Sequence, residues 1–161
     1  LPQIIVKSTR EVMGEIAALI YDNPAEKLLM IGVTGTNGKT TTTYMIRSIL
    51  INAGYHVGLI GTIQIMIDNE IFAIHNTTPN VIDLQHILQQ MHNKHIDYVV
   101  MEVSSHALAE NRVSGIEFDT AIFTNLTQDH LDFLQRTGGD GRRERPGYHH
   151  QAGRSDDYGH Q

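Results

Sequence analysis

Apolar residues along this chain form short continuous runs, which alternate with stripes of apolar residues at helical spacing. A short continuous run is typical of a β-strand that is buried on both faces, as in a parallel sheet. Strands are predicted at Leu28–Val33, Val57–Ile60, Tyr98–Val103 and Thr120–Thr124. Because helical stripes separate the runs, the pattern predicts an α/β fold with a mostly parallel sheet that helices flank on both faces.

Three segments carry apolar residues at helical spacing. The first begins after Ser8, which stands three residues before Glu11 as in a capping box, and it ends before Asn23-Pro24. The second is Thr41–Ala53, followed by Gly54 as a C-terminal cap. The third is an amphipathic helix with the stripe Leu84, Ile87, Leu88 and Met91.

Two smaller features are predicted outside this alternation. Ile4–Val6 indicates a short strand near the start of the chain. Asp68-Asn69 separates the segments Ile63–Ile67 and Glu70–Ile74, which is typical of a hairpin with a polar turn. We expect this hairpin to extend one edge of the sheet.

Residues 135–161 break the pattern, because they contain no Ile, Leu, Val, Met or Phe. Such a segment cannot bury enough apolar surface to offset the entropy of ordering it. We therefore expect a disordered C-terminal tail that is foreign to the fold. The tail holds five Arg and four acidic residues, and this near balance argues against the alternative of a basic arm that binds nucleic acid.

Composition and charge narrow the function classes. With 161 residues and no cysteine, one domain is expected, and a disulfide framework or a cysteine-ligated metal site is excluded. The formal net charge of −6 gives no basic footprint for nucleic acid. The first residues lack the pattern of a signal peptide, and no apolar run reaches the roughly 18 residues that a membrane span needs. We expect a cytoplasmic protein with no membrane or nucleic-acid partner.

The loop between the Leu28–Val33 strand and the Thr41–Ala53 helix carries the clearest candidate chemistry. Glycines in such a turn let backbone N–H groups approach phosphate oxygens, and the start of a helix favours negative charge. Lys39 could reach the β- and γ-phosphates of a nucleotide, and the Thr40 hydroxyl could bind Mg²⁺. The predicted nucleotide-binding residues are Gly35, Thr36, Asn37, Gly38, Lys39, Thr40 and Thr41.

This loop departs from the general Walker pattern, which requires a glycine five residues before Gly38. Val33 occupies that position, and Gly32 and Gly35 lie on either side of it. We therefore interpret the loop as a variant of the Walker type.

Four segments occur in a recognisable order and at a recognisable spacing. They are Gly32–Thr41 (GVTGTNGKTT), Asn76–Pro79 (NTTP), Met101–Leu108 (MEVSSHAL) and Phe123–Asp132 (FTNLTQDHLD). Together they resemble the Mur ligase family, and within it the branch that makes muramyl tripeptides. The resemblance covers about residues 1–133 and implies an incomplete Mur ligase central domain of the P-loop NTPase-like type.

For this branch, the resemblance implies an ATP-dependent amide ligase of peptidoglycan precursor synthesis. ATP and Mg²⁺ would be the cofactors. The partners would be UDP-MurNAc-L-Ala-D-Glu and a free amino acid, either meso-diaminopimelate or L-lysine, and the protein would be a monomer. Two alternatives stay open: a nucleotide-binding fragment without catalysis, and an amide ligase of the folylpolyglutamate or cyanophycin type, against which Asn76–Pro79 and Ser104–His106 argue.

The resemblance also implies roles for single residues. Lys39, Glu102 and His130 would be catalytic, and Thr40, Glu102 and His130 would surround Mg²⁺. Glu102 fits this role on other grounds too, because it lies at the end of a buried strand, where ligands gather in open α/β sheets. The residues that would orient the substrate are Asn76, Thr77, Thr78, Ser104 and Arg112.

The resemblance further predicts how the chain is divided. Residues 1–25 would end an N-terminal UDP-binding domain, residues 26–134 would form a partial central ATP-binding domain, and residues 135–161 would be the tail. The family carries a carbamylated Lys beyond the His matched by His130, but no Lys follows Lys94 in this chain. We therefore expect the chain alone to bind nucleotide weakly and to ligate nothing.

Overall fold

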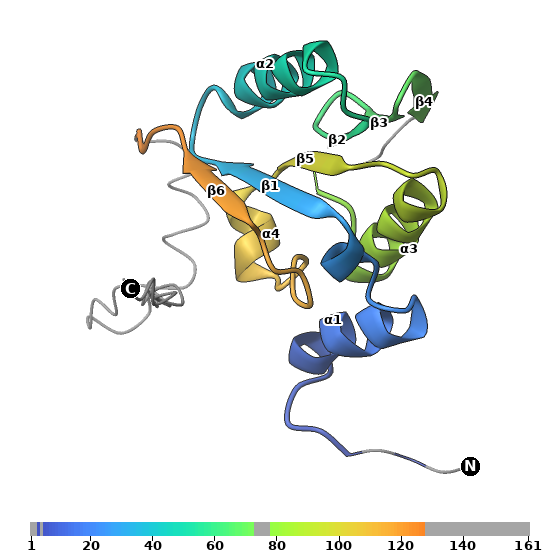
Figure 1. Ribbon diagram of the computed structural model, residues 1–161. Helices are drawn as coiled ribbons and strands as arrows, with labels where there is room; N and C mark the ends of the chain where they lie inside the picture. Colours follow the sequence, from blue (N-terminus) through green and yellow to red (C-terminus); the bar gives the residue numbers. More distant parts are fainter. Residues whose placement is uncertain (1–2, 4, 73–77, 128–161) are drawn as a thin grey trace, which may run out of the picture. The chain divides into compact units, whose positions relative to one another are not determined.

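The computed structural model describes residue 3, residues 5–72 and residues 78–127 (Figure 1). The chain divides into two compact units, residues 1–128 and 129–161, and every described residue belongs to the first. The predicted tail, residues 135–161, therefore lies outside the described residues. In chain order the elements are α1 (Thr9–Ile20), the 3-10 helix η1 (Pro24–Lys27), β1 (Leu29–Thr34), α2 (Lys39–Asn52), β2 (Val57–Ile60), β3 (Ile65–Ile67), β4 (Glu70–Phe72), α3 (Val81–Asn93), β5 (Tyr98–Glu102), α4 (Ser105–Ala109) and β6 (Thr120–Phe123).

The strands form one sheet in the order β4-β3-β2-β5-β1-β6. β1 pairs in parallel with β5 and β6, and β2 pairs in parallel with β5. β3 and β4 add an antiparallel hairpin to the edge at β2, and Asp68 takes a φ of 51° at its turn. This order confirms the predicted mostly parallel α/β sheet with the hairpin as an edge addition.

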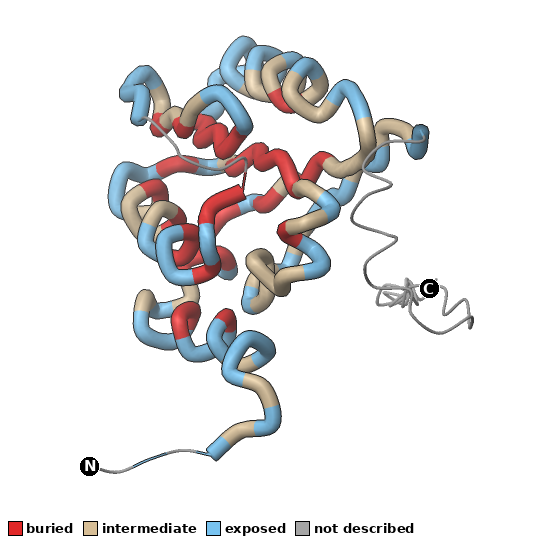
Figure 2. Tube along the Cα trace, turned by 180° about the vertical axis from the view of Figure 1, so that it is seen from behind, coloured by how far each residue is buried: buried red, intermediate tan, exposed pale blue. Residues whose placement is uncertain are grey.

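Alternating side chains of the parallel strands enter two apolar clusters, one on each face of the sheet. Along β1, Met30 belongs to the cluster with α3, whereas Val33 belongs to the cluster with α2. Figure 1 shows α2 over one face of the sheet and α3 and α4 over the other. The buried residues gather along the strands between these helices (Figure 2). Burial on both faces explains why these strands appear in the sequence as continuous apolar runs.

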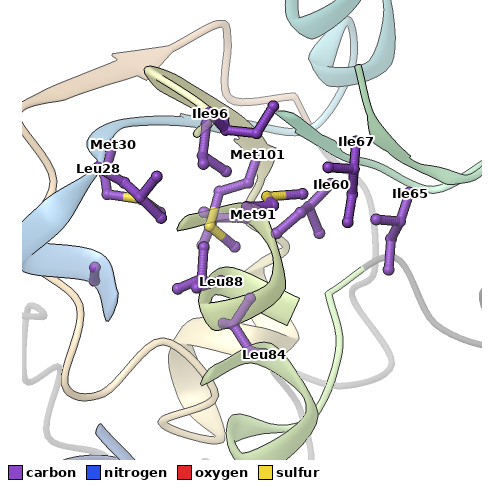
Figure 3. Packing of buried hydrophobic residues seen from close by; sticks show 13 residues of the cluster. Leu28, Met30, Ile60, Ile65, Ile67, Leu84, Leu88, Met91, Ile96 and Met101 are labelled. Carbon is purple, nitrogen blue, oxygen red and sulfur yellow. The ribbon is translucent and has the colours of Figure 1, made fainter. Parts of the chain in front are cut away.

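The larger cluster packs α3 onto the sheet (Figure 3). α3 contributes Leu84, Leu88 and Met91, all fully buried. Gly58 of β2 lies directly beneath α3, and a Cβ at that position would come within 2.6 Å of the Met91 sulfur. Glycine therefore permits the close approach of helix and strand on which this half of the core depends.

The predicted strand at Ile4–Val6 is wrong where the structure describes it. Ile5 and Val6 lie in no strand, and Ile5 is 95% exposed. A strand needs a neighbour that pairs with its backbone N–H and C=O groups, and an apolar run by itself does not supply one.

The ends of the helices follow local hydrogen bonding. Ser8 caps α1 by accepting from the Glu11 N–H, as predicted. α2 begins at Lys39, two residues earlier than expected, because Gly38 turns the chain with a φ of 87° directly before the helix. α4 was not predicted, since five residues are too few to show a stripe; the Ser104 hydroxyl caps it by accepting from the Ala107 N–H. No helix within the described ranges has both the length and the apolar character that crossing a membrane requires.

Replacing Leu88 with Ala should destabilise the fold by about 2–5 kcal/mol, because it leaves a cavity between α3 and the sheet. Urea unfolding followed by circular dichroism measures this loss. Leu19→Ala is the matched control: its side chain is 69% exposed on α1, and the free energy of unfolding should change by only about 0.5 kcal/mol. Equal losses in the two variants would contradict this account of the core.

Candidate active site at the carboxyl edge of the sheet

The loops that follow the four parallel strands meet at one edge of the sheet. The phosphate loop, residues 35–38, follows β1, and residues 61–62, 103–104 and 124–127 follow β2, β5 and β6. Parallel neighbours direct all their carboxyl ends to the same edge, where ligands bind in open α/β sheets. The sheet order therefore brings together polar groups from four distant parts of the sequence.

The phosphate loop leads directly into the first turn of α2. The first hydrogen bond within the helix runs from the Thr42 N–H to the Gly38 carbonyl at 2.9 Å, so the N–H groups of residues 38–41 have no partner inside the helix. Gly38 is the N-cap and has no side chain with which to cap them. This arrangement suits an anion, because free N–H groups and the helix dipole both favour negative charge.

Lys39 extends back over the loop. Its ammonium group donates to the Gly35 carbonyl at 2.7 Å and to the Thr36 carbonyl at 3.0 Å. The positive charge is thus held beside the N–H groups at the start of α2. The predicted role of Lys39 at nucleotide phosphates stays a prediction.

Glu102 lies at the end of β5 and is only 1% exposed. Alternation along the strand places it on the same face as Val100, which is the face covered by α2. The Thr40 hydroxyl donates to Glu102 Oε2 at 3.0 Å. Thr62 donates twice, from its N–H to Oε1 at 3.0 Å and from its hydroxyl to Oε2 at 2.9 Å. Three donors therefore satisfy a carboxylate that would otherwise be costly to bury.

The Thr40 and Glu102 oxygens fit the chemistry of a magnesium site. Mg²⁺ is a hard cation that prefers oxygen ligands, and it commonly combines one or two carboxylates with phosphate oxygens. Among residues 5–72 and 78–127, no group of three or more His, Cys, Asp or Glu side chains could hold a metal ion. The predicted third ligand, His130, lies outside the described residues.

Three of the predicted substrate residues lie beside Glu102, and the other two, Asn76 and Thr77, lie outside the described residues. The hydroxyl of Thr78, which is fully buried, donates to the Glu102 carbonyl at 3.1 Å and accepts from the Ser104 N–H at 3.4 Å. Arg112 donates from Nη1 to the Thr78 carbonyl at 3.0 Å. Thr78, Ser104 and Arg112 thus form one hydrogen-bonded group at the end of β5.

Glu110, which was given no binding role, forms an ion pair with Arg112. The Arg112 Nε and Nη2 atoms lie 2.7 and 2.6 Å from the same carboxylate oxygen. The hydrogen bond and charge of Arg112 hold the pKa of Glu110 below its ordinary value of 4.5, and the charges of Arg10 and His106 act in the same direction. The carboxylate of Glu110 therefore pairs with the guanidinium of Arg112, which was expected to orient the substrate.

The sequence interpretation missed the polar residues that hold the site together. Thr62 anchors Glu102, while Thr124, Asn125 and Thr127 contact the phosphate loop. Each of them follows the carboxyl end of a strand. The same rule that singled out Glu102 could therefore have found them.

A family model described as the Mur ligase middle domain matches residues 33–138 of this chain, a range that contains every described residue of the site. The chain belongs to the Mur ligase family. A relative in Caldanaerobacter subterraneus subsp. tengcongensis, named UDP-N-acetylmuramoyl-L-alanyl-D-glutamate--2,6-diaminopimelate ligase, is 52% identical over 130 residues. That match covers 81% of this chain and 27% of the relative. The chain thus spans about a quarter of the length of this Mur ligase.

Solved structures agree with the family assignment. A ligase structure with the same name as that relative matches with a TM-score of 0.66 and 28% identity, covering 80% of this chain and 26% of the other. The folylpolyglutamate synthetase from Lactobacillus casei matches with a TM-score of 0.56 over 84% of this chain and 40% of its own. Its identity is 20%, so the likeness concerns the fold alone. The predicted Mur ligase resemblance is confirmed.

The Glu110–Arg112 pair should make stability depend on pH. Because the folded state lowers the pKa of Glu110, the pair stabilises the fold above about pH 4.5, and this contribution is lost as the pH falls through the lowered value. The effect is small, since the carboxylate is partly exposed. Glu110→Gln should therefore lose less stability than the unchanged chain between pH 6 and pH 3, as measured by urea midpoints.

The control is the same substitution in an Arg112→Leu background, where Glu110→Gln should alter the pH dependence much less, because Arg112 is the largest cause of the lowered pKa of Glu110. If Glu110→Gln changes the pH dependence equally in both backgrounds, Arg112 is not the cause.

Proposed function

We propose that this chain carries the ATP-binding centre of an amide ligase that extends the muramyl peptide of a peptidoglycan precursor. The observation that carries the proposal is the contact between Thr40 and Glu102, beside Lys39 and the uncapped start of α2. It joins an anion site, a fixed positive charge and a buried carboxylate at one edge of the sheet. That combination suits a magnesium nucleotide, whose phosphates and metal need all three.

Each residue of the loop would act by position and charge. The N–H groups of residues 38–41 would bind phosphate oxygens, and the Lys39 ammonium would offset negative charge on the β- and γ-phosphates. Phosphoryl transfer needs little covalent help from protein, so fixed donors in the correct place suffice. Thr36, Asn37 and Thr41 would complete the nucleotide site.

Mg²⁺ would be held by the Thr40 hydroxyl and the Glu102 carboxylate, and His130 is proposed as a further ligand. When bound, the ion would neutralise phosphate charge. Thr62 would keep Glu102 oriented through its two hydrogen bonds.

The proposed substrates are UDP-MurNAc-L-Ala-D-Glu and meso-diaminopimelate. Three relatives are 48–55% identical to this chain over the matched residues, and their names specify 2,6-diaminopimelate. These names support meso-diaminopimelate over L-lysine. The substrate carboxylate would accept the γ-phosphoryl group of ATP, which releases ADP. The amine of meso-diaminopimelate would then attack the acyl phosphate, form the amide bond and release inorganic phosphate. Asn76, Thr77, Thr78, Ser104 and Arg112 would orient the peptide, since Thr78 and Arg112 lie beside the end of β5.

We also propose domain limits, a location and an oligomeric state for the enzyme. Residues 1–25 would end a preceding UDP-binding domain, and residues 26–134 would form part of the central domain. The enzyme would act in the cytoplasm as a monomer. The 161-residue chain would bind nucleotide without ligating, so the noncatalytic alternative describes the isolated chain rather than a different family.

Lys39→Ala should abolish detectable binding of Mg–ATP, because it removes the only side-chain cation of residues 35–41. Isothermal titration calorimetry on the 161-residue chain measures this. Lys94→Ala is the control: that lysine pairs with Glu70 of the hairpin, at the far edge of the sheet. Unchanged ATP affinity in Lys39→Ala would sink the proposal.

Glu102→Gln should remove the advantage that Mg²⁺ gives to ATP binding. The substitution keeps the shape of the side chain but removes the charge, so affinity in Mg²⁺ should fall about tenfold, while affinity in EDTA should not fall. Glu26→Gln in η1, before the start of β1, is the matched control and should leave both affinities unchanged. A Mg²⁺ effect of the same size in Glu102→Gln and the unchanged chain would argue against a metal at Glu102.

A further inference from the structure

The segment that follows β6 holds the phosphate loop by several hydrogen bonds. The Asn125 carboxamide contacts both polar backbone groups of Asn37: Oδ1 accepts from the Asn37 N–H at 3.0 Å, and Nδ2 donates to the Asn37 carbonyl at 3.0 Å. The Asn125 carbonyl accepts from the Thr36 N–H at 2.9 Å. Exchanging the amide oxygen and nitrogen would place donor against donor and acceptor against acceptor, so these contacts fix the orientation of the carboxamide.

Thr124 adds a second attachment. Its hydroxyl donates to the Asn37 carbonyl at 2.7 Å and lies 3.2 Å from the Thr34 carbonyl. Its N–H also donates to the Thr34 carbonyl, at 2.9 Å. The same short segment therefore binds the chain on both sides of Gly35, where β1 ends and the loop begins.

Position 35 requires a glycine for two reasons: its backbone angle and the close approach of Thr124 and Asn125. It has a φ of 131°, and a Cβ there would lie 2.2 Å from the Thr124 hydroxyl oxygen and 2.9 Å from the Asn125 carbonyl oxygen. Nothing larger than glycine fits beneath the segment. The absence of a side chain at Gly35 thus leaves room for Thr124 and Asn125 at the end of β6, in addition to any phosphate.

We infer that Thr124 and Asn125, which we call the β6 latch, are positioning residues of the nucleotide site. The inference rests on the proposed function. A glycine-rich loop is flexible, and ordering it on binding would cost affinity. The latch orders the loop beforehand through Thr36 and Asn37, and it leaves the N–H groups at the start of α2 for the phosphates. The nucleotide site is therefore built from β6 as well as from β1 and α2.

Loss of the latch should weaken nucleotide binding. Asn125→Ala removes two side-chain hydrogen bonds to Asn37, so the dissociation constant for Mg–ATP should rise about tenfold. Thr124→Val keeps the side-chain shape without the hydroxyl, and the constant should rise about fivefold. Thr124→Ser restores the hydroxyl and should bind within about twofold of the unchanged chain. A merely structural role would not produce this difference between valine and serine.

The experiment is isothermal titration of the 161-residue chain and its variants with Mg–ATP, with Asn52→Ala at the end of α2 as the control. Equal affinity for valine, serine and the unchanged chain at position 124 would overturn the latch. So would tighter binding by Asn125→Ala, because Asn125 would then compete with phosphate for the Asn37 N–H. If the unchanged chain bound no Mg–ATP, the proposed function would fail, and the latch would lose its role with it.

Amide hydrogen exchange without nucleotide tests the attachment separately. The amide proton of Asn37 should exchange faster in Asn125→Ala, because the variant removes its side-chain acceptor, while those of the buried strands β1 and β5 stay protected. Unchanged exchange at residue 37 would overturn the latch even if ATP binds.

Discussion

The Glu102 carboxylate, buried at the end of β5, is the group on which the geometry of this edge depends. A buried charge must have donors, and here Thr40 and Thr62 supply all three. Thr40 lies in the first turn of α2, and Thr62 follows β2. The hydrogen bonds to this one carboxylate therefore connect the start of α2 with the carboxyl ends of β2 and β5.

The sheet order makes these contacts possible. β1 lies between β5 and β6, and β2 lies on the other side of β5, so four parallel carboxyl ends are neighbours. The apolar clusters on both faces hold the strands in register. The clusters are made of apolar side chains, but by fixing the register they determine which polar residues lie next to one another at the carboxyl edge. The phosphate loop is consequently supported from both sides, by Glu102 through Thr40 and by Thr124 and Asn125 after β6.

Much of this could be predicted from the sequence, because the strongest patterns are local. Continuous apolar runs indicated the buried strands, and the strand–loop–helix context indicated the roles of Lys39 and Thr40. Glu102 was named from the family resemblance, and its place at the end of a buried strand supported the choice. The failures concern information that is not local: Ile4–Val6 lacked a partner strand, and α4 was too short to show a period.

Long-range pairs escaped prediction for the same physical reason. Thr62 lies 40 residues from Glu102 in the chain, and Asn125 lies 88 residues from Asn37. Only the register of the sheet brings them into contact. Arg112 was expected to orient the substrate, but Glu110 of the same chain forms an ion pair with it, and the sequence pattern gave no sign of this contact.

Two-dimensional ¹H–¹⁵N NMR of the chain, titrated with Mg–ATP, shows whether the nucleotide binds at the carboxyl edge of the sheet. We expect the largest amide shifts on residues 36–41 and on Thr62, with smaller changes at residues 124–125. Shifts confined to other surfaces, such as the exposed side of α2 around Met45 and Ile49, would rule out nucleotide binding at this edge.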